Sequence, residues 1–166
     1  MLRLIPAPLH RGLYMVAHAA RRRWWRLSKA RLVGCRVLAF DAQDRLLLIR
    51  HSYGSRRWML PGGGIGAKES PIGAAMRELL EETGCTLLDP RSVAMRDEPL
   101  YGTTNRVHVI TGLALDLPRC DGREVIEAAF FATDKLPDDL APALQRGLPD
   151  WITAAKAGRP HPPAAR

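Results

Sequence analysis

Short apolar runs separated by turn residues make up most of the chain. The runs at 32–40 and 45–50, joined by turn-forming residues, predict a β-hairpin. A third run at 58–60 predicts a short strand. We expect it to end at Pro61, because proline cannot continue a central strand. Beyond a central helix, four further runs predict strands at 85–88, 92–100, 106–117 and 125–132. The pattern therefore predicts a sheet of several short strands.

The central helix is marked at both ends by residues suited to those positions. Ser70 is a good N-terminal cap, Pro71 suits the first helical position, and Gly84 suits a left-handed C-terminal cap. The sequence thus predicts a helix over 71–83. Its apolar residues recur at helical spacing and predict one buried stripe, formed by Ile72, Met76, Leu79 and Leu80.

A second helical segment follows the last predicted strand. Residues 136–158 predict a C-terminal helix that is interrupted near Pro149. Strands, one helix, more strands and a final helix predict an α+β fold in which helices cover a mixed sheet. We expect one domain over 31–158, followed by a flexible tail over 159–166.

The N-terminal segment differs from this domain in charge. Residues 1–40 hold nine Lys or Arg and no acidic residue, so the net charge of +8 is concentrated there. Apolar residues at helical spacing predict a basic helical arm over 1–30, with a stripe of Leu9, Leu13, Val16, Ala17, Ala20, Trp24 and Leu27. Three interpretations stay open: the arm packs on the domain, contacts RNA or anionic lipid, or forms a dimer contact.

The cysteines and the hydropathy pattern indicate the compartment. Cys35, Cys85 and Cys120 are odd in number and far apart, which argues against a disulfide framework and against a zinc knuckle. No apolar run approaches the roughly 18 residues needed to span a bilayer. We expect a soluble, cytoplasmic protein.

Three carboxylates crowd into one short stretch of the central helix. Glu78, Glu81 and Glu82 occupy an arc of about 100° that points away from the apolar stripe. Their mutual repulsion weakens a helix, and a bound divalent cation would reverse the sign of that interaction. Oxygen ligands favour Mg²⁺ or Mn²⁺, and Mg²⁺ is usually held together with substrate phosphates. The preceding glycines, 62–64, allow a ligand to approach the backbone closely.

The same segment carries a longer motif that resembles the signature of the Nudix hydrolases. That signature reads G-x5-E-x7-R-E-U-x-E-E-x-G-U, where U is a bulky apolar residue. It is matched here by Gly63, Glu69, Arg77, Glu78, Leu79, Glu81, Glu82, Gly84 and Cys85. Only Cys85, a small residue at the last U position, departs from it. The resemblance implies an αβα sandwich and the hydrolysis of a nucleoside diphosphate linked to another moiety, NDP-X, to a nucleoside monophosphate and phosphorylated X.

The resemblance also implies roles for individual residues. Glu78, Glu81 and Glu82, with the carbonyl of Gly62, are the expected ligands of Mg²⁺, or of Mn²⁺ in its place, and one of the three carboxylates takes the proton from the attacking water, with Glu78 and Glu81 the expected catalytic residues. Glu69 and Arg77 are expected to form an ion pair that orients the helix, which Gly63 and Gly84 also support. A further catalytic acid is expected after the motif from Glu124 or Glu127, with Glu127 favoured, although a solvated carboxylate at a strand edge is an equal reading.

The substrate is less well defined by the sequence. Candidates for substrate contact are Arg50 and His51, at the end of the strand before the motif, and Tyr101 and Arg106 after it. We expect a small nucleotide substrate, with ADP-ribose or an NDP-sugar ahead of a (d)NTP. The alternatives are a 5′-end RNA pyrophosphohydrolase, in which the basic arm holds RNA, and a non-catalytic ligand-sensing module. The resemblance also leaves a homodimer open.

Overall fold

A mixed five-stranded sheet forms the centre of the computed structural model, which describes residues 32–100, 103–120 and 124–158. The strand order is β3-β4-β1-β2-β5, and only β1 and β4 run parallel. The strands are β1 (Leu32–Phe40), β2 (Leu46–His51), β3 (Leu87–Leu100), β4 (Thr103–Ala114) and β5 (Val125–Phe131). The helices are α2 (Pro71–Thr83), α3 (Pro142–Gln145) and α4 (Leu148–Ala157). The predicted arm and tail lie outside the described residues.

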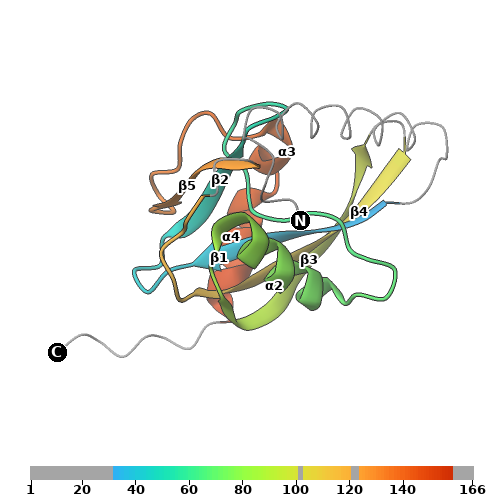
Figure 1. Ribbon diagram of the computed structural model, residues 1–166, viewed down its shortest axis with the longest axis horizontal. Helices are drawn as coiled ribbons and strands as arrows, with labels where there is room; N and C mark the ends of the chain where they lie inside the picture. The colour runs from blue at the N-terminus through green and yellow to red at the C-terminus, as the bar shows by residue number, and fades with distance from the viewer. Residues whose placement is uncertain (1–31, 101–102, 121–123, 159–166) are drawn as a thin grey trace, which may run out of the picture.

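Helices cover both faces of the sheet, with α2 in front and α4 behind (Figure 1). Successive residues of a strand point to opposite faces, so each strand contributes to two cores. Leu38 and Leu48 pack on the α4 side with Trp58 and Trp151, whereas their neighbours Val37, Ala39 and Leu47 pack on the α2 side with Ala74, Ala75 and Leu79. Burial on both faces explains why β1 and β2 are continuous apolar runs. The α+β fold expected from the sequence is confirmed.

A gap in the sheet positions the glycine-rich segment. β1 and β2 pair only at Phe40 and Leu46, and beyond that point residues 58–65 lie between them. Met59 exchanges backbone hydrogen bonds with Ile49 on β2, at 2.9 and 3.0 Å. The carbonyls of Pro61 and Gly63 accept from the backbone of β1, both at 2.8 Å. The strand expected at 58–60 is therefore a pair of isolated bridges, and the glycines are fixed to the centre of the sheet.

The predicted ends of the central helix are confirmed. The Ser70 side chain accepts a hydrogen bond from the Gly73 amide at 3.0 Å, and Gly84 has φ of 70°. The predicted buried stripe is wrong in part. Met76 and Leu80 are 40% and 56% exposed, while Ala74 and Ala75 are fully buried. The helix lies close against the sheet through these small residues and Leu79, so Met76 and Leu80 are left at its flanks.

Three other element boundaries also differ from the sequence prediction. The strands expected at 85–88 and 92–100 form one strand, β3, because two bulges absorb the residues between them. β4 starts and ends three residues earlier than expected, and the exposed Leu115 and Leu117 lie beyond it. The C-terminal helix breaks at Arg146 and Gly147, and Pro149 belongs to the first turn of α4, where its missing amide hydrogen costs nothing. Within the described residues, no helix is long and apolar enough to cross a membrane.

Candidate active site

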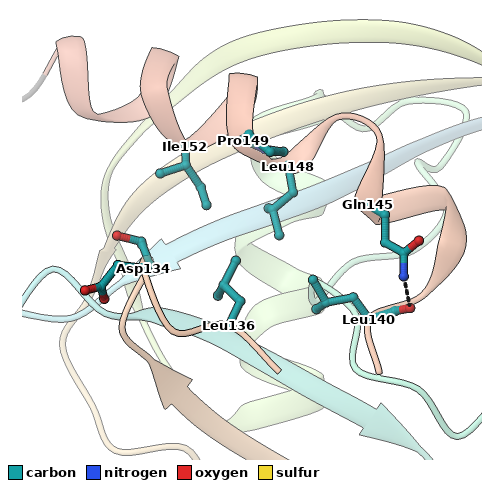
Figure 2. A pocket seen from close by; sticks show the side chains of 8 residues that line it. Asp134, Leu136, Leu140, Gln145, Leu148, Pro149 and Ile152 are labelled. Atoms are coloured by element: carbon teal, nitrogen blue, oxygen red, sulfur yellow. Dashed lines mark hydrogen bonds between the residues drawn. The ribbon is translucent and has the colours of Figure 1, made fainter. Parts of the chain in front are cut away.

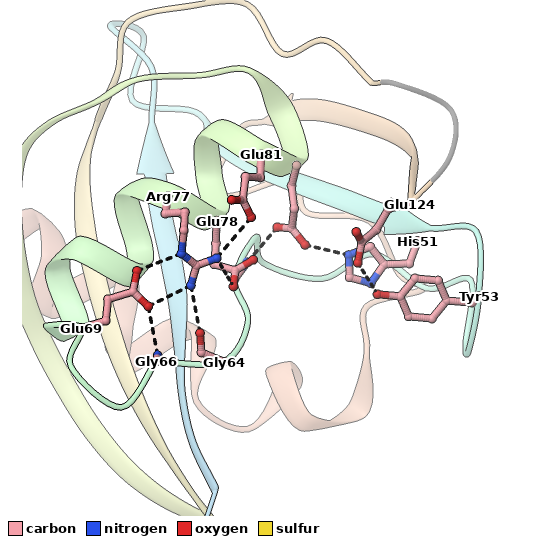
Figure 3. Close-up of polar contacts among 11 residues, drawn as sticks. His51, Tyr53, Gly64, Gly66, Glu69, Arg77, Glu78, Glu81 and Glu124 are labelled. Carbon is pink, nitrogen blue, oxygen red and sulfur yellow. Dashed lines mark hydrogen bonds and ion pairs between the residues drawn. The ribbon is translucent and has the colours of Figure 1, made fainter. Parts of the chain in front are cut away.

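Arg77 joins the carboxylates of the motif to one another (Figure 3). Its Nε and Nη2 donate to the two oxygens of Glu69, at 2.8 and 3.0 Å, so the expected ion pair is present. Its Nη1 also donates to Glu78 at 2.8 Å and to Glu81 at 3.2 Å. Nη2 reaches the Gly64 carbonyl at 3.1 Å as well. Arg77 therefore ties the glycine-rich segment to α2 and partly neutralises three acids, of which the sequence indicated only one.

Glu82 lies deeper than the other two carboxylates of the helix. Its side chain is 5% exposed, against 16% for Glu78 and 60% for Glu81. One oxygen lies 3.0 Å from Nε2 of His51, and the other accepts from the Gly62 amide at 2.9 Å. The three carboxylates were expected to point together away from the apolar stripe, but Glu82 is buried while Glu81 is exposed. The gap between β1 and β2 brings the glycines under α2, so Glu82 points inward.

Burial and neighbouring negative charge make Glu82 and Glu78 costly to ionise. Burial raises the pKa of Glu82, opposed by its bonds to His51 and Gly62 and reinforced by the negative charge of Glu124. Burial likewise raises the pKa of Glu78, with Arg77 opposing it and the charges of Glu82 and Glu81 adding to it. Perturbed carboxylates gathered in one place are characteristic of functional sites, although ion-pair networks perturb pKa values too.

Glu69 behaves in the opposite way. The hydrogen bonds from Arg77, and then that from the Gly66 amide, lower its pKa from 4.5 to about 2. Glu69 is therefore a firmly ionised partner of Arg77. Glu69 is therefore a structural support of the site, whereas Glu78 and Glu82 carry its unbalanced charge.

Two glycines allow the close approach between the loop and the helix. A Cβ on Gly63 would lie 2.5 Å from a carboxylate oxygen of Glu78. Gly62 has φ of 144°, and a Cβ there would collide with the carbonyl oxygen of Cys35. Gly62 therefore requires glycine, whereas a Cβ at Gly63 would displace the end of the Glu78 side chain.

The structure reverses the preference for Glu127 over Glu124. Ala129 and Phe131, which share the face of β5 with Glu127, pack in the core on the α4 side. Glu127 accordingly pairs with Arg50, at 3.4 Å, on the face opposite α2. Glu124 instead accepts a hydrogen bond from the Tyr53 hydroxyl at 2.7 Å and contributes to the field at Glu82. Because side chains alternate along a strand, Glu124 and Glu127 could have been assigned to opposite faces from the sequence. The bulge at His51, which sets the register of β2 against β5, has no clear sequence signal.

The expected substrate contacts do not converge on the motif. Arg50 stacks over Trp58 at 4.7 Å and pairs with Asp139 at 2.7 Å, on the α4 side. Arg106 forms a bidentate pair with Asp97 of the neighbouring strand, at 2.8 and 3.0 Å. Tyr101 lies outside the described residues. Only His51 faces the motif, and Tyr53, stacked on its ring at 5.0 Å, is a residue that the sequence did not single out.

The donors of this site suit a hard divalent cation. They are carboxylate oxygens whose negative charge is only partly balanced, and a divalent cation would relieve their repulsion. Among the residues that the structure describes, no three acidic, histidine or cysteine side chains form a ready-made metal cage. Arg77 draws Glu78 and Glu81 to one side, and His51 holds Glu82. Binding would therefore require Glu78 and Glu81 to turn from the guanidinium toward Glu82.

An open hollow of about 400 Å³ lies elsewhere, between α4 and the segment that follows β5 (Figure 2). Its lining is mainly apolar, and it consists of Thr133, Asp134, Leu136, Leu140, Gln145, Leu148, Pro149 and Ile152. A single carboxylate among these residues cannot hold a metal and a diphosphate. The chemistry of the motif belongs to the other face of the sheet.

Comparisons with known proteins agree with this geometry. Diphosphoinositol polyphosphate phosphohydrolase 3-alpha of Mus musculus is 42% identical over 50 residues, which are 30% of this chain and 30% of that protein. The crystal structure of a MutT NUDIX hydrolase from Burkholderia pseudomallei has a TM-score of 0.65 at 27% identity, over 72% of this chain and 97% of that one. A UDP-X diphosphatase structure has a TM-score of 0.66 over 78% of this chain and 64% of that one, and at 24% identity it shows the fold alone.

The family comparison covers most of the chain. The family model of the NUDIX domain matches residues 30–152, which include the whole sheet, the glycine-rich segment and α2. The matched range contains every carboxylate of the site described above. The chain therefore belongs to the Nudix family.

Proposed function

We propose that the protein hydrolyses the diphosphate linkage of a small nucleoside diphosphate derivative with the help of Mg²⁺. Water adds to one phosphorus and the bridging P–O bond breaks, so that NDP-X gives a nucleoside monophosphate and phosphorylated X. The observation that carries this proposal is the gathering of Glu78, Glu81 and Glu82 on α2, where Glu78 lies against Gly63 and Glu82 is bonded to the Gly62 amide. Among the described residues, the guanidinium of Arg77 pairs with Glu78 and Glu81, and Glu82 contacts His51 instead.

The carboxylates of α2, with the Gly62 carbonyl, would hold the metal. The cation, when bound, neutralises the diphosphate and lowers the pKa of a coordinated water. Both oxygens of Glu82 already accept hydrogen bonds, so Glu82 suits a ligand better than a general base. Glu78 and Glu81 remain the candidates for accepting the proton of the attacking water. Glu124 replaces Glu127 as the additional acid, since it lies on the Glu82 side of the sheet.

Two substrate classes follow from different observations. An NDP-sugar or ADP-ribose remains the first candidate, ahead of a (d)NTP. A diphosphoinositol polyphosphate is the second, favoured by the mouse relative that is 42% identical over 50 residues. The loop that leads from His51 also presents two adjacent exposed arginines, Arg56 and Arg57, which suit a highly anionic substrate.

Contact of the basic arm with RNA or anionic lipid stays a prediction, as do a homodimer and a cytoplasmic location. A chain that lacks residues 1–30 tests the first of these. Loss of RNA or vesicle binding relative to the full chain would support it, and unchanged binding would contradict it. A steep salt dependence of RNA hydrolysis would favour RNA as the substrate.

A substrate panel tests the proposal. ADP-ribose, a UDP-sugar, a dNTP, a diphosphoinositol polyphosphate and 5′-triphosphorylated RNA are each incubated with the full chain and Mg²⁺. Released phosphate is read directly and after phosphatase treatment. We expect hydrolysis of the nucleotide sugars, abolished by EDTA. Hydrolysis that is undiminished in EDTA would overturn the mechanism, and preference for the inositol compound would select the second candidate.

A further inference from the structure

We infer that His51 is a positioning residue, which holds the Glu82 carboxylate by an Nε2–H hydrogen bond so that its remaining lone pairs face the cation. This inference rests on the proposed function, because it assigns Glu82 to the metal. It concerns a residue outside the motif, contributed by β2 rather than by α2. The inference assigns the hydrogen bond to Nε2 of the ring. It can therefore be tested with replacement side chains that do or do not carry a donor as far as Nε2.

Each of the two oxygens of the Glu82 carboxylate is in hydrogen-bond contact with a different group. His51 Nε2 lies 3.0 Å from one oxygen of Glu82, and the Gly62 amide donates to the other at 2.9 Å. The Gly62 donor is fixed, because its segment is bonded to β1 on both sides of it. Each carboxylate oxygen has two lone pairs, so one on each oxygen remains for a ligand. Two donors from different elements therefore define the plane and direction of the group.

The ring of His51 is itself fixed in place. A bulge between Arg50 and His51 changes the register of β2 against β5 at this point, and bulges commonly re-aim a side chain. The ring stacks on Tyr53 with centroids 5.0 Å apart and an interplanar angle of 16°. The Tyr53 hydroxyl bonds to Glu124 at 2.7 Å, and the Ser52 amide donates to the Glu124 carbonyl at 2.8 Å. The bulge, the stack and these two bonds thus hold the imidazole against Glu82.

As a ligand of the cation, Glu82 is ionised and can only accept, which places the shared hydrogen on Nε2 of His51. Because that nitrogen is used by Glu82, His51 acts on the cation through Glu82. Groups that orient a metal ligand in this way commonly change metal affinity by about 10- to 100-fold when they are removed.

Three substitutions separate the hydrogen bond from the bulk of the ring. The amide nitrogen of His51→Gln reaches about as far as Nε2, whereas that of His51→Asn reaches only about as far as Nδ1, and His51→Leu has no donor. Binding of Mg²⁺ to the full chain without substrate is measured by calorimetry, and kcat and KM are measured separately. His108, half-buried on β4, supplies matched His→Gln and His→Leu controls.

We expect His51→Leu and His51→Asn to weaken Mg²⁺ binding by about 10- to 100-fold, and His51→Gln to restore it to within about threefold of the wild type. The His108 variants should bind Mg²⁺ as the wild type does. Equal loss in all three His51 variants, or no loss in any, would overturn the inference, as would an equal loss in His108→Leu. A wild-type chain that binds no divalent cation would overturn the proposed function as well. If His51→Leu does not fold, the Asn and Gln pair decides.

Discussion

The two faces of the sheet treat charged side chains in opposite ways. On the α4 side, the half-buried Arg36 and Arg50 each have acidic partners. Arg36 forms a bidentate pair with Glu98, at 2.7 and 2.8 Å, and lies over the ring of Trp151. Arg50 has two acidic partners and stacks on Trp58. Arg36 and Arg50 are thus paired with acidic neighbours and aromatic rings, and the buried Nε of Arg50 is the atom of this face that makes no hydrogen bond among the described residues.

On the α2 side, carboxylates outnumber the cations. Arg77 serves Glu69, Glu78 and Glu81, while Glu82 depends on hydrogen bonds from His51 and Gly62. Ionised groups that are buried without full pairing cost free energy in the folded state. A fold that retains them therefore indicates a cationic ligand. The comparison teaches that unbalanced charge, rather than the apolar hollow beside α4, marks the functional face.

The largest expected effect on activity comes from replacing Glu82, the buried acid on the α2 side. Glu82→Gln should lower kcat/KM by about 10³-fold, or about 4 kcal/mol, because a ligand of the catalytic cation is lost. Its free energy of unfolding in EDTA should change by less than about 1 kcal/mol, because the amide keeps the shape of the group. Steady-state kinetics and urea unfolding measure the two quantities.

Glu127→Gln is the matched control on the other face. It removes an exposed acid that pairs with Arg50, and it should leave kcat/KM within about twofold of the wild type. A loss of turnover in Glu127→Gln as large as that in Glu82→Gln would contradict the assignment of the chemistry to the α2 side.

Adjacent core residues of β2 sharpen the comparison. Leu47 and Leu48 are both fully buried, but Leu47 packs under α2 and Leu48 packs toward α4. Truncation of either to alanine should lower the free energy of unfolding by about 3 kcal/mol. Only Leu47→Ala should also weaken Mg²⁺ binding, because it removes packing between the sheet and α2, which carries the carboxylates. Equal Mg²⁺ affinity in the two variants would show that the packing of α2 does not control the site.

The smallest expected effect concerns the pH dependence of the supporting ion pair. Arg77 lowers the pKa of Glu69 from 4.5 to about 2, so the pair stabilises the fold above pH 4.5 and that contribution is lost as the pH falls toward 2. Glu69→Gln should therefore be less stable than the wild type at pH 7, with a difference that shrinks below pH 4.5. Urea unfolding in EDTA at a series of pH values measures this. A difference that stays constant with pH would exclude the ionised pair as its cause.

Local signals predicted the parts of the structure that depend on neighbouring residues. The caps at Ser70 and Gly84 defined α2 correctly, and the apolar runs located β1, β2 and β5. The resemblance to the Nudix signature anticipated the ion pair of Glu69 and Arg77. These features are set within one or two helical turns or one strand, where the sequence carries the information directly.

Features that depend on distant segments could not be predicted in the same way. The inward turn of Glu82 requires the gap between β1 and β2, which brings Gly62 beneath the helix. The exchange of Glu127 for Glu124 depends on the bulge at His51, where the register against β5 changes. Met76 and Leu80 were expected to be buried because they are apolar, but the close approach of Ala74 and Ala75 to the sheet decided otherwise.

Calorimetric titration of Mg²⁺ into the full chain tests the central claim most directly, because it needs no knowledge of the substrate. We expect saturable binding by the wild type and by Glu127→Gln with the same affinity. We expect binding to be weakened by more than about 100-fold in Glu82→Gln, since the loss of a ligand should exceed that of a group that only orients one. Equal affinity for Mg²⁺ in Glu82→Gln and Glu127→Gln would contradict the claim that the carboxylates of the α2 face form the metal site.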